Sequence, residues 1–164
     1  MPNAAARPLY VPDSAHVART LLTELRSAHR ELMWQISAME KLTREPAFDP
    51  KTCTNGRWRL SQASLARRLL ASRIGDFFLV RVSENEREDL KSLMLADQAL
   101  LRDSSAHLGR WSGEGIKSDW PNFCREAREM FRKTQRHIAL EQRVLYPLLE
   151  QSEGGGARQG AWRE

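Results

Sequence analysis

The sequence predicts an all-α protein, an up-down four-helix bundle. Four long segments carry apolar residues at steps of three and four, which is helical periodicity. Prolines and glycines are concentrated between these segments, where helices end. A chain of 164 residues, 41% of them hydrophobic, is enough for one domain with a core. We expect the bundle to span residues 13–150, between a flexible N-terminal segment, 1–12, and a flexible C-terminal tail, 151–164.

The first expected helix begins at Asp13 or Ser14, both good N-caps, and runs to Glu45. Pro46 prevents its continuation, because the residue before a proline disfavours the helical conformation. The inner face of this helix consists of Leu22, Leu25, His29, Leu32, Ile36 and Met39. Residues 46–60 contain two prolines and an Asn-Gly pair, so we expect a loop there.

The second expected helix opens at Ser61, and the third covers Glu86 to Gly109. The residues expected on the inner face of the second helix are Leu65, Leu69, Leu70, Ile74, Phe77, Phe78 and Arg81. By propensity alone, residues 77–82 also fit a strand. One face of the third helix carries Met94, Gln98, Leu101, Ser105 and Leu108.

The last expected helix has the clearest pattern. Ser118 or Asp119 caps it, and Pro121 lies in its first turn, where the missing N–H costs nothing. The steps along its inner face alternate between four and three, which is a heptad pattern suited to a bundle. That face consists of Phe123, Ala127, Met130, Thr134, His137, Glu141, Val144 and Leu148.

Polar residues interrupt this apolar face at its centre. A buried carboxylate is costly without a partner, so Glu141 needs a metal, another cation or a proton opposite it. His137 lies one turn before Glu141 on the same face, and imidazole with carboxylate is a usual ligand pair for iron, manganese or zinc. His29 lies centrally on the inner face of the first helix. These three residues are our candidate metal ligands.

The segment from His137 to Leu148 resembles the last helix of the hemerythrin (HHE cation-binding) family. It carries His-x-x-x-Glu followed by Val-Leu-Tyr-Pro, and the segment from Ala28 to Leu32 resembles the first-helix histidine segment of that family. The resemblance covers roughly residues 14–150. It implies a four-helix bundle with an oxo- or hydroxo-bridged diiron site that binds or responds to oxygen, with ligands at His29, His137 and Glu141.

The second and third helices depart from the family pattern. No histidine occurs between His29 and His107. The region that matches the second-helix motif, residues 80–86, offers Arg81 and Asn85 or, in a neighbouring register, Val82 and Glu86. In the third helix, Gln98 follows an aspartate where a histidine is expected. We therefore expect no cofactor or a single weakly held metal, with Gln98 and Glu86 as weaker candidate ligands. The alternative is a diiron site completed by carboxylates from among Glu84, Glu86, Glu88, Asp89 and Asp97.

Arg81 leaves two interpretations open. Leu70, Ile74, Phe77 and Arg81 follow one another at steps of four, three and four, which puts a guanidinium on the inner face. There Arg81 is a candidate core charge partner, replacing the positive charge of a metal beside Glu141. The other interpretation is that Arg81 extends to solvent.

Together these features suggest a bundle with a degenerate diiron site, acting as a regulatory or sensory module that binds a small ligand or a protein. The alternative is an iron protein that binds or senses dioxygen or nitric oxide through a non-standard site. No apolar run is long enough for a membrane span, so we expect a cytoplasmic protein. The net charge is +5, but Glu126 and Glu129 interleave with the arginines of the last helix, which does not favour nucleic-acid binding. Motifs of nucleophilic hydrolases are absent. The sequence does not indicate the oligomeric state.

Overall fold

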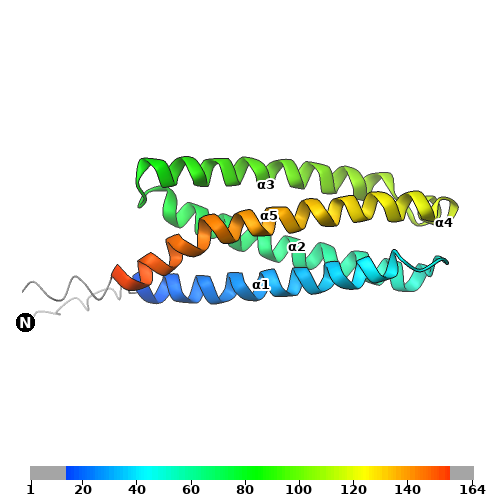
Figure 1. The fold of residues 1–164 in the computed structure, drawn as a ribbon, viewed down its shortest axis with the longest axis horizontal. Coiled ribbons are helices and arrows are strands. Elements are labelled where there is room, and N and C mark those ends of the chain that lie inside the picture. The colour runs from blue at the N-terminus through cyan, green and yellow to red at the C-terminus, as the bar shows by residue number, and fades with distance from the viewer. Residues whose placement is uncertain (1–13, 156–164) are drawn as a thin grey trace, which may run out of the picture.

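The computed structural model describes residues 14–155, and they form an all-α protein. Four long helices lie in contact: α1 (Ser14–Leu42), α2 (Pro50–Leu79), α3 (Glu84–Arg110) and α5 (Trp120–Gly155). The short helix α4 (Gly113–Ser118) connects α3 to α5. Successive long helices run in opposite directions along one axis (Figure 1). The predicted all-α class with four long helices is confirmed. The predicted flexible segment 1–12 lies outside the described residues, as does most of the predicted flexible tail 151–164, of which residues 151–155 belong to α5.

The core consists of two apolar clusters, one toward each end of the bundle. The cluster near α4 contains Leu32 and Ile36 of α1 together with Phe123 and Phe131 of α5. The other contains Leu22, Leu25, Leu70, Ile74, Leu90, Leu145 and Leu149. His29 follows Leu25 and precedes Leu32 on the same buried face of α1, so a polar residue lies between the two clusters.

Helix α2 begins earlier than the sequence predicted: residues 46–49 connect the helices as expected, but the expectation of a loop over residues 50–60 is wrong. The Asp49 carboxylate accepts hydrogen bonds from the backbone N–H groups of Lys51 and Thr52, and caps the helix. Pro50 occupies the first helical position, where a proline needs no donor. Gly56 lies inside the helix, where a Cβ would overlap the Met39 sulfur of α1. Close packing against α1 therefore explains this glycine better than a turn does.

The buried face of α2 also differs from the predicted one. Leu65 and Leu69 are 39% and 58% exposed. The buried residues from the middle of the helix onward are Ala63, Arg67, Leu70, Ile74, Gly75 and Phe78. Residues 77–79 are helical, so the alternative of a strand there is wrong.

The other helix ends follow local capping rules. Ser83 caps α3 in a capping box with Glu86, whose carboxylate accepts from the Ser83 backbone N–H. Asp119 accepts from the Asn122 N–H at the start of α5, as the sequence predicted. Helix α1 ends at Leu42, before the predicted Glu45, and α5 continues to Gly155, past residue 150. No helix within residues 14–155 has the length and apolarity needed to cross a membrane.

Candidate functional site

A layer of buried polar side chains separates the two apolar clusters, and each long helix contributes to it. We call it the ionic layer; its members are His29 of α1, Arg67 of α2, Asp97 of α3, and His137 and Glu141 of α5. His29 and Arg67 are each 2% exposed and Glu141 is 1% exposed. Charged groups so deep in a protein must be paired, because burial of an isolated charge is prohibitive. The contacts inside the layer provide this pairing.

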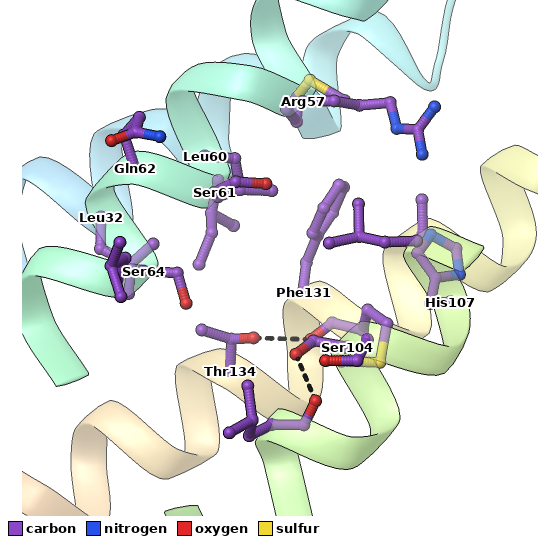
Figure 2. Close-up of a pocket in the computed structure, with 18 of the residues that line it drawn as sticks. Leu32, Arg57, Leu60, Ser61, Gln62, Ser64, Ser104, His107, Phe131 and Thr134 are labelled. Atoms are coloured by element: carbon purple, nitrogen blue, oxygen red, sulfur yellow. Dashed lines mark hydrogen bonds between the residues drawn. The ribbon is translucent and has the colours of Figure 1, made fainter. Parts of the chain in front are cut away.

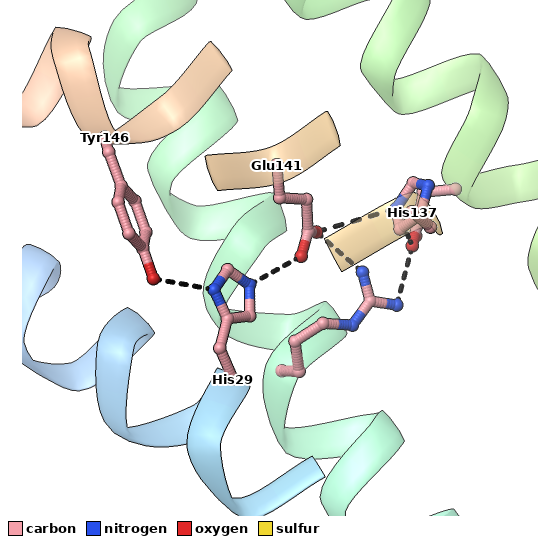
Figure 3. A network of polar contacts seen from close by, with 6 residues as sticks. His29, His137, Glu141 and Tyr146 are labelled. Carbon is pink, nitrogen blue, oxygen red and sulfur yellow. Dashed lines mark hydrogen bonds and ion pairs between the residues drawn. The ribbon is translucent and has the colours of Figure 1, made fainter. Parts of the chain in front are cut away.

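Glu141 lies at the centre of the ionic layer and binds a donor with each of its oxygens. Its Oε1 accepts a hydrogen bond from Arg67 Nη1 at 2.6 Å, and its Oε2 accepts from His29 Nε2 at 2.8 Å. A carboxylate can only accept, so His29 carries its proton on Nε2. The other ring nitrogen, Nδ1, lies 2.9 Å from the Tyr146 hydroxyl (Figure 3). Tyr146 therefore fixes the orientation of the His29 ring.

Arg67 joins the two carboxylates of the layer. Its Nη2 donates to Asp97 Oδ1 at 2.8 Å, while Nη1 binds Glu141. One planar guanidinium thus bridges an acid on α3 and an acid on α5. Charge-assisted hydrogen bonds of this kind are short and strong, and a guanidinium presents its donors in a fixed fork. The third donor position, Nε, has no hydrogen-bond partner among the described residues.

His137 lies beside the same two acids. Its Nε2 is 3.2 Å from Asp97 Oδ1 and 3.6 Å from Glu141 Oε1, which are ion-pair distances (Figure 3). Nevertheless, Nε2 makes no hydrogen bond of good geometry to any described residue. The two oxygens nearest to His137 are the ones that already bind Arg67. The imidazole therefore faces acceptors that the guanidinium occupies.

The ionisation of the layer follows from these contacts. Burial raises the pKa of Glu141, but the contacts with His137 and His29 and the charge of Arg67 outweigh it and lower the pKa from 4.5 to about 2. Burial also opposes the ionisation of Asp97, yet His137 and Arg67 lower its pKa below the usual value. Burial lowers the pKa of His137, but the contacts with Asp97 and Glu141 raise it by more than burial lowers it. The pKa of His137 therefore lies above its usual value. Two anions thus face one permanent cation and one imidazole that readily becomes cationic.

The three ligands predicted from sequence lie in this layer, but not around a single point. His29 contacts Oε2 of Glu141, while His137 lies nearest to Oε1. Glu141 is therefore placed between the two histidines. The cluster whose ligand atoms all lie within 4.8 Å of one another consists of Asp97, His137 and Glu141.

The pairing of Arg81 with Glu141 is corrected, because Arg67 takes that place. Arg81 is exposed and follows the end of α2; its guanidinium donates to the Phe77 carbonyl and lies 4.3 Å from the centre of the Phe77 ring. The physical reason is that α2 ends at Leu79, so Arg81 lies in the turn beyond the helix. The buried face through Arg67, Leu70, Ile74 and Phe78 is not continued there, and Arg67, three to four turns earlier, is the arginine that reaches the core.

The two weaker candidates also lie outside the ionic layer. Gln98 is exposed, and the neighbouring Asp97 turns inward instead. Glu86 closes the capping box at the start of α3. Sequence reasoning missed Arg67 and Tyr146. For Arg67 the sequence contained a signal, because Arg67 lies between Ala63 and Leu70 on one helical face. A charged residue on a face that also carries apolar residues is likewise what marks Glu141 on α5.

The residues present do not fit two irons. Arg67 places a guanidinium between the carboxylates of Asp97 and Glu141, where a second cation would be strongly repelled. Asp97, His137 and Glu141 form a possible triad for one metal. That metal would need Oδ1 and Oε1, the two oxygens that Arg67 holds. Arg67 and a metal are therefore mutually exclusive at this site.

Comparison with known proteins does not identify the chain: no family model, no curated protein and no solved structure matches it.

Proposed function

We propose that this protein is a hemerythrin-like bundle that works without a metal, as a regulatory or sensory module that binds a small ligand. One observation carries the proposal: the Arg67 guanidinium binds Glu141 at 2.6 Å and Asp97 at 2.8 Å. An internal cation thereby meets the charge requirement that iron meets in the family this sequence resembles. Arg67 balances the charge of the buried acids without a metal. The function that we assign to the protein is therefore ligand binding rather than oxygen chemistry.

The charge count supports a stable metal-free state. Glu141 and Asp97 are anionic, Arg67 is permanently cationic, and the raised pKa of His137 favours its protonated form. A divalent ion entering this layer would first have to displace a buried guanidinium from two charge-assisted hydrogen bonds. Metal uptake by the natural protein is therefore unfavourable.

The test is metal content with and without Arg67. Protein expressed in iron-supplemented medium should be colourless and contain no stoichiometric iron by elemental analysis. Arg67→Met leaves Asp97, His137 and Glu141 without their cation, so this variant should bind one Co²⁺ per chain, seen as a visible ligand-field spectrum. Arg73→Met is the matched control, because Arg73 lies on the same helix with a 69% exposed side chain. It should remain metal-free.

A second candidate function is an iron protein that binds or senses dioxygen or nitric oxide. The observation in its favour is the Asp97–His137–Glu141 triad, with all three ligand atoms within 4.8 Å. Two irons per natural chain, with a charge-transfer absorption band, would establish this function and overturn the metal-free proposal. An Arg67→Met variant that stays metal-free in excess Co²⁺ would also count against our assignment of Arg67.

A further inference from the structure

A cavity of about 320 Å³ lies between the long helices, on the α4 side of the ionic layer. Its volume is near the lower end of the ~300–1,000 Å³ range of small-molecule pockets. We call it the α2–α3 cavity, because its lining includes exposed residues of both helices. The walls are mostly apolar, and Figure 2 shows Leu32, Leu60 and Phe131 among the lining residues.

The opening lies between α2 and α3. Leu65 of α2 and Leu101 and Leu108 of α3 line the cavity, yet they are 39%, 37% and 44% exposed. Leucines that line a cavity and also meet solvent form its rim. An apolar rim leading to an apolar interior suits a ligand with a hydrocarbon or aromatic body.

Hydroxyl groups inside the cavity have hydrogen-bonding capacity to spare. The Ser104 hydroxyl donates to the Leu101 carbonyl, and the Thr134 hydroxyl donates to the Met130 carbonyl, each at 3.0 Å. Figure 2 shows both of these hydrogen bonds. Each oxygen keeps lone pairs that can accept from a ligand or a water. The interior therefore tolerates some polarity.

Among the described residues, Arg68 is a cation at the cavity without an acidic partner. It is half-buried and lines both the α2–α3 cavity and a neighbouring cavity of about 240 Å³. Within residues 14–155, no carboxylate lies at ion-pair distance from its guanidinium, whereas the adjacent Arg67 is paired with two. A partly desolvated guanidinium without an anion favours binding of a carboxylate.

Arg57 differs from Arg68 in being held by the protein. Its Nη2 donates to the Trp111 carbonyl at 2.8 Å, and its guanidinium lies over the Phe123 ring. In Figure 2 Arg57 lies close to His107, at one end of the cavity. Arg57 therefore helps to close that end. Of these two arginines, Arg68 is the one whose side chain makes no hydrogen bond or ion pair to another described residue and can receive a ligand.

We propose that the α2–α3 cavity binds a small organic monoacid, with its apolar body among the leucines and its carboxylate on Arg68. This inference rests on the proposed function as a ligand-binding module and names the ligand class and the site. The cavity is also adjacent to the ionic layer. Arg68 follows Arg67 in sequence, and Thr134 lies one turn before His137 on α5, so the ligand binds within one helical turn of the layer.

The experiment is a calorimetric titration of protein shown to be metal-free. The probes are octanoate and 3-phenylpropionate, each compared with its neutral amide. The natural protein should bind at least one acid saturably, with one site per chain, and the matching amide about tenfold more weakly. Arg68→Gln should weaken acid binding about tenfold, which corresponds to ~1.4 kcal/mol, and leave amide binding unchanged. Arg59→Gln should bind like the natural protein, because Arg59 is exposed on the same helix and does not line the cavity.

A second variant tests the location. Ser64 lines the cavity from α2, and Ser64→Phe should fill it and abolish binding of acid and amide alike. Absence of saturable binding of either acid, equal affinity for acid and amide, or undiminished acid binding by Arg68→Gln would each overturn the proposal. Because the titration uses protein already shown to contain no metal, its failure leaves the metal-free proposal standing. Stoichiometric iron in the natural protein would instead contradict that proposal directly.

Discussion

At the scale of single residues, Arg67 is a buried cation held by two acids, Asp97 and Glu141. Two carboxylates accept its hydrogen bonds, and it is 2% exposed. A buried ion pair adds little stability compared with apolar packing, but removal of one partner leaves the other charge buried and uncompensated. The loss of Arg67 would leave Glu141 with only its imidazole contacts.

We expect Arg67→Met to lower the free energy of unfolding by about 3–5 kcal/mol in the presence of a chelator, because it strands a buried carboxylate. Arg81→Met should change it by less than about 0.5 kcal/mol, because Arg81 is exposed at the end of α2. Urea denaturation of both variants measures the difference. Equal losses in the two variants would show that Arg67 is not the cation on which the core depends.

The sequence indicated one half of this charge pair and missed the other. Glu141 stands out because it lies with Thr134 and His137 at the centre of a heptad face that is apolar on both sides of these three residues. Arg67 has a similar position on α2, but Leu65 and Leu69 define a competing apolar face two residues away. That face is exposed, and it lines the openings of cavities. Periodicity alone does not distinguish a face that meets the core from one that borders a cavity.

At the scale of helices, two glycines within α2 have different surroundings. A Cβ at Gly75 would meet only the Met94 sulfur, at an ordinary contact distance of 3.9 Å. A Cβ at Gly56 would overlap the Met39 sulfur, and Met39 is 2% exposed. Glycine inside a helix costs up to about 1 kcal/mol relative to alanine. The two sites therefore respond oppositely to the same substitution.

Gly75→Ala should stabilise the protein by about 0.5–1 kcal/mol, since it improves helix propensity without a clash. Gly56→Ala should be neutral or destabilising, because Met39 must move within a packed core. Thermal unfolding of the two variants beside the natural protein is the measurement. A larger gain from Gly56→Ala than from Gly75→Ala would contradict the packing of α1 against α2 described above.

Helix boundaries were harder to predict than helix existence. Pro46 and Pro50 both resemble helix terminators, yet Pro50 begins a helix. The distinguishing feature is Asp49, whose carboxylate caps the N–H groups that follow the proline. The short helix α4 was not predicted, because it contains Gly113 and Gly115 and glycine disfavours the helical conformation. In the structure, Ser112 caps it by accepting from the Gly115 N–H.

At the scale of the whole molecule, the ionic layer couples global stability to pH. The pKa of Glu141 is about 2 in the folded protein, below its ordinary 4.5. A carboxyl group with a lowered pKa stabilises the fold above the unfolded-state pKa, and this contribution is lost as the pH falls toward the folded-state value. The contribution is roughly 3 kcal/mol, from about 1.4 kcal/mol per pKa unit.

We therefore expect the natural protein to lose stability between pH 4.5 and pH 2. Glu141→Gln should lose about 3 kcal/mol less over the same interval, because it lacks the titrating carboxyl. Chemical denaturation at several pH values in this range gives both curves. Parallel curves would mean that Glu141 is not ionised inside the fold.

Two long-range hydrogen bonds connect the turn after α1 to α5. Trp120 Nε1 donates to the Glu45 carbonyl at 3.0 Å, and Arg128 Nη1 donates to the Thr43 carbonyl at 3.2 Å. Helix α5, which is synthesised after the other helices, also supplies Glu141 to Arg67. When only the first three long helices have emerged from the ribosome, the nascent chain lacks the donors for these two carbonyls. It also lacks the Glu141 carboxylate that Arg67 binds in the folded protein. The fold therefore closes after α5 has emerged, and a fragment covering residues 14–112 should melt without a cooperative transition in circular dichroism.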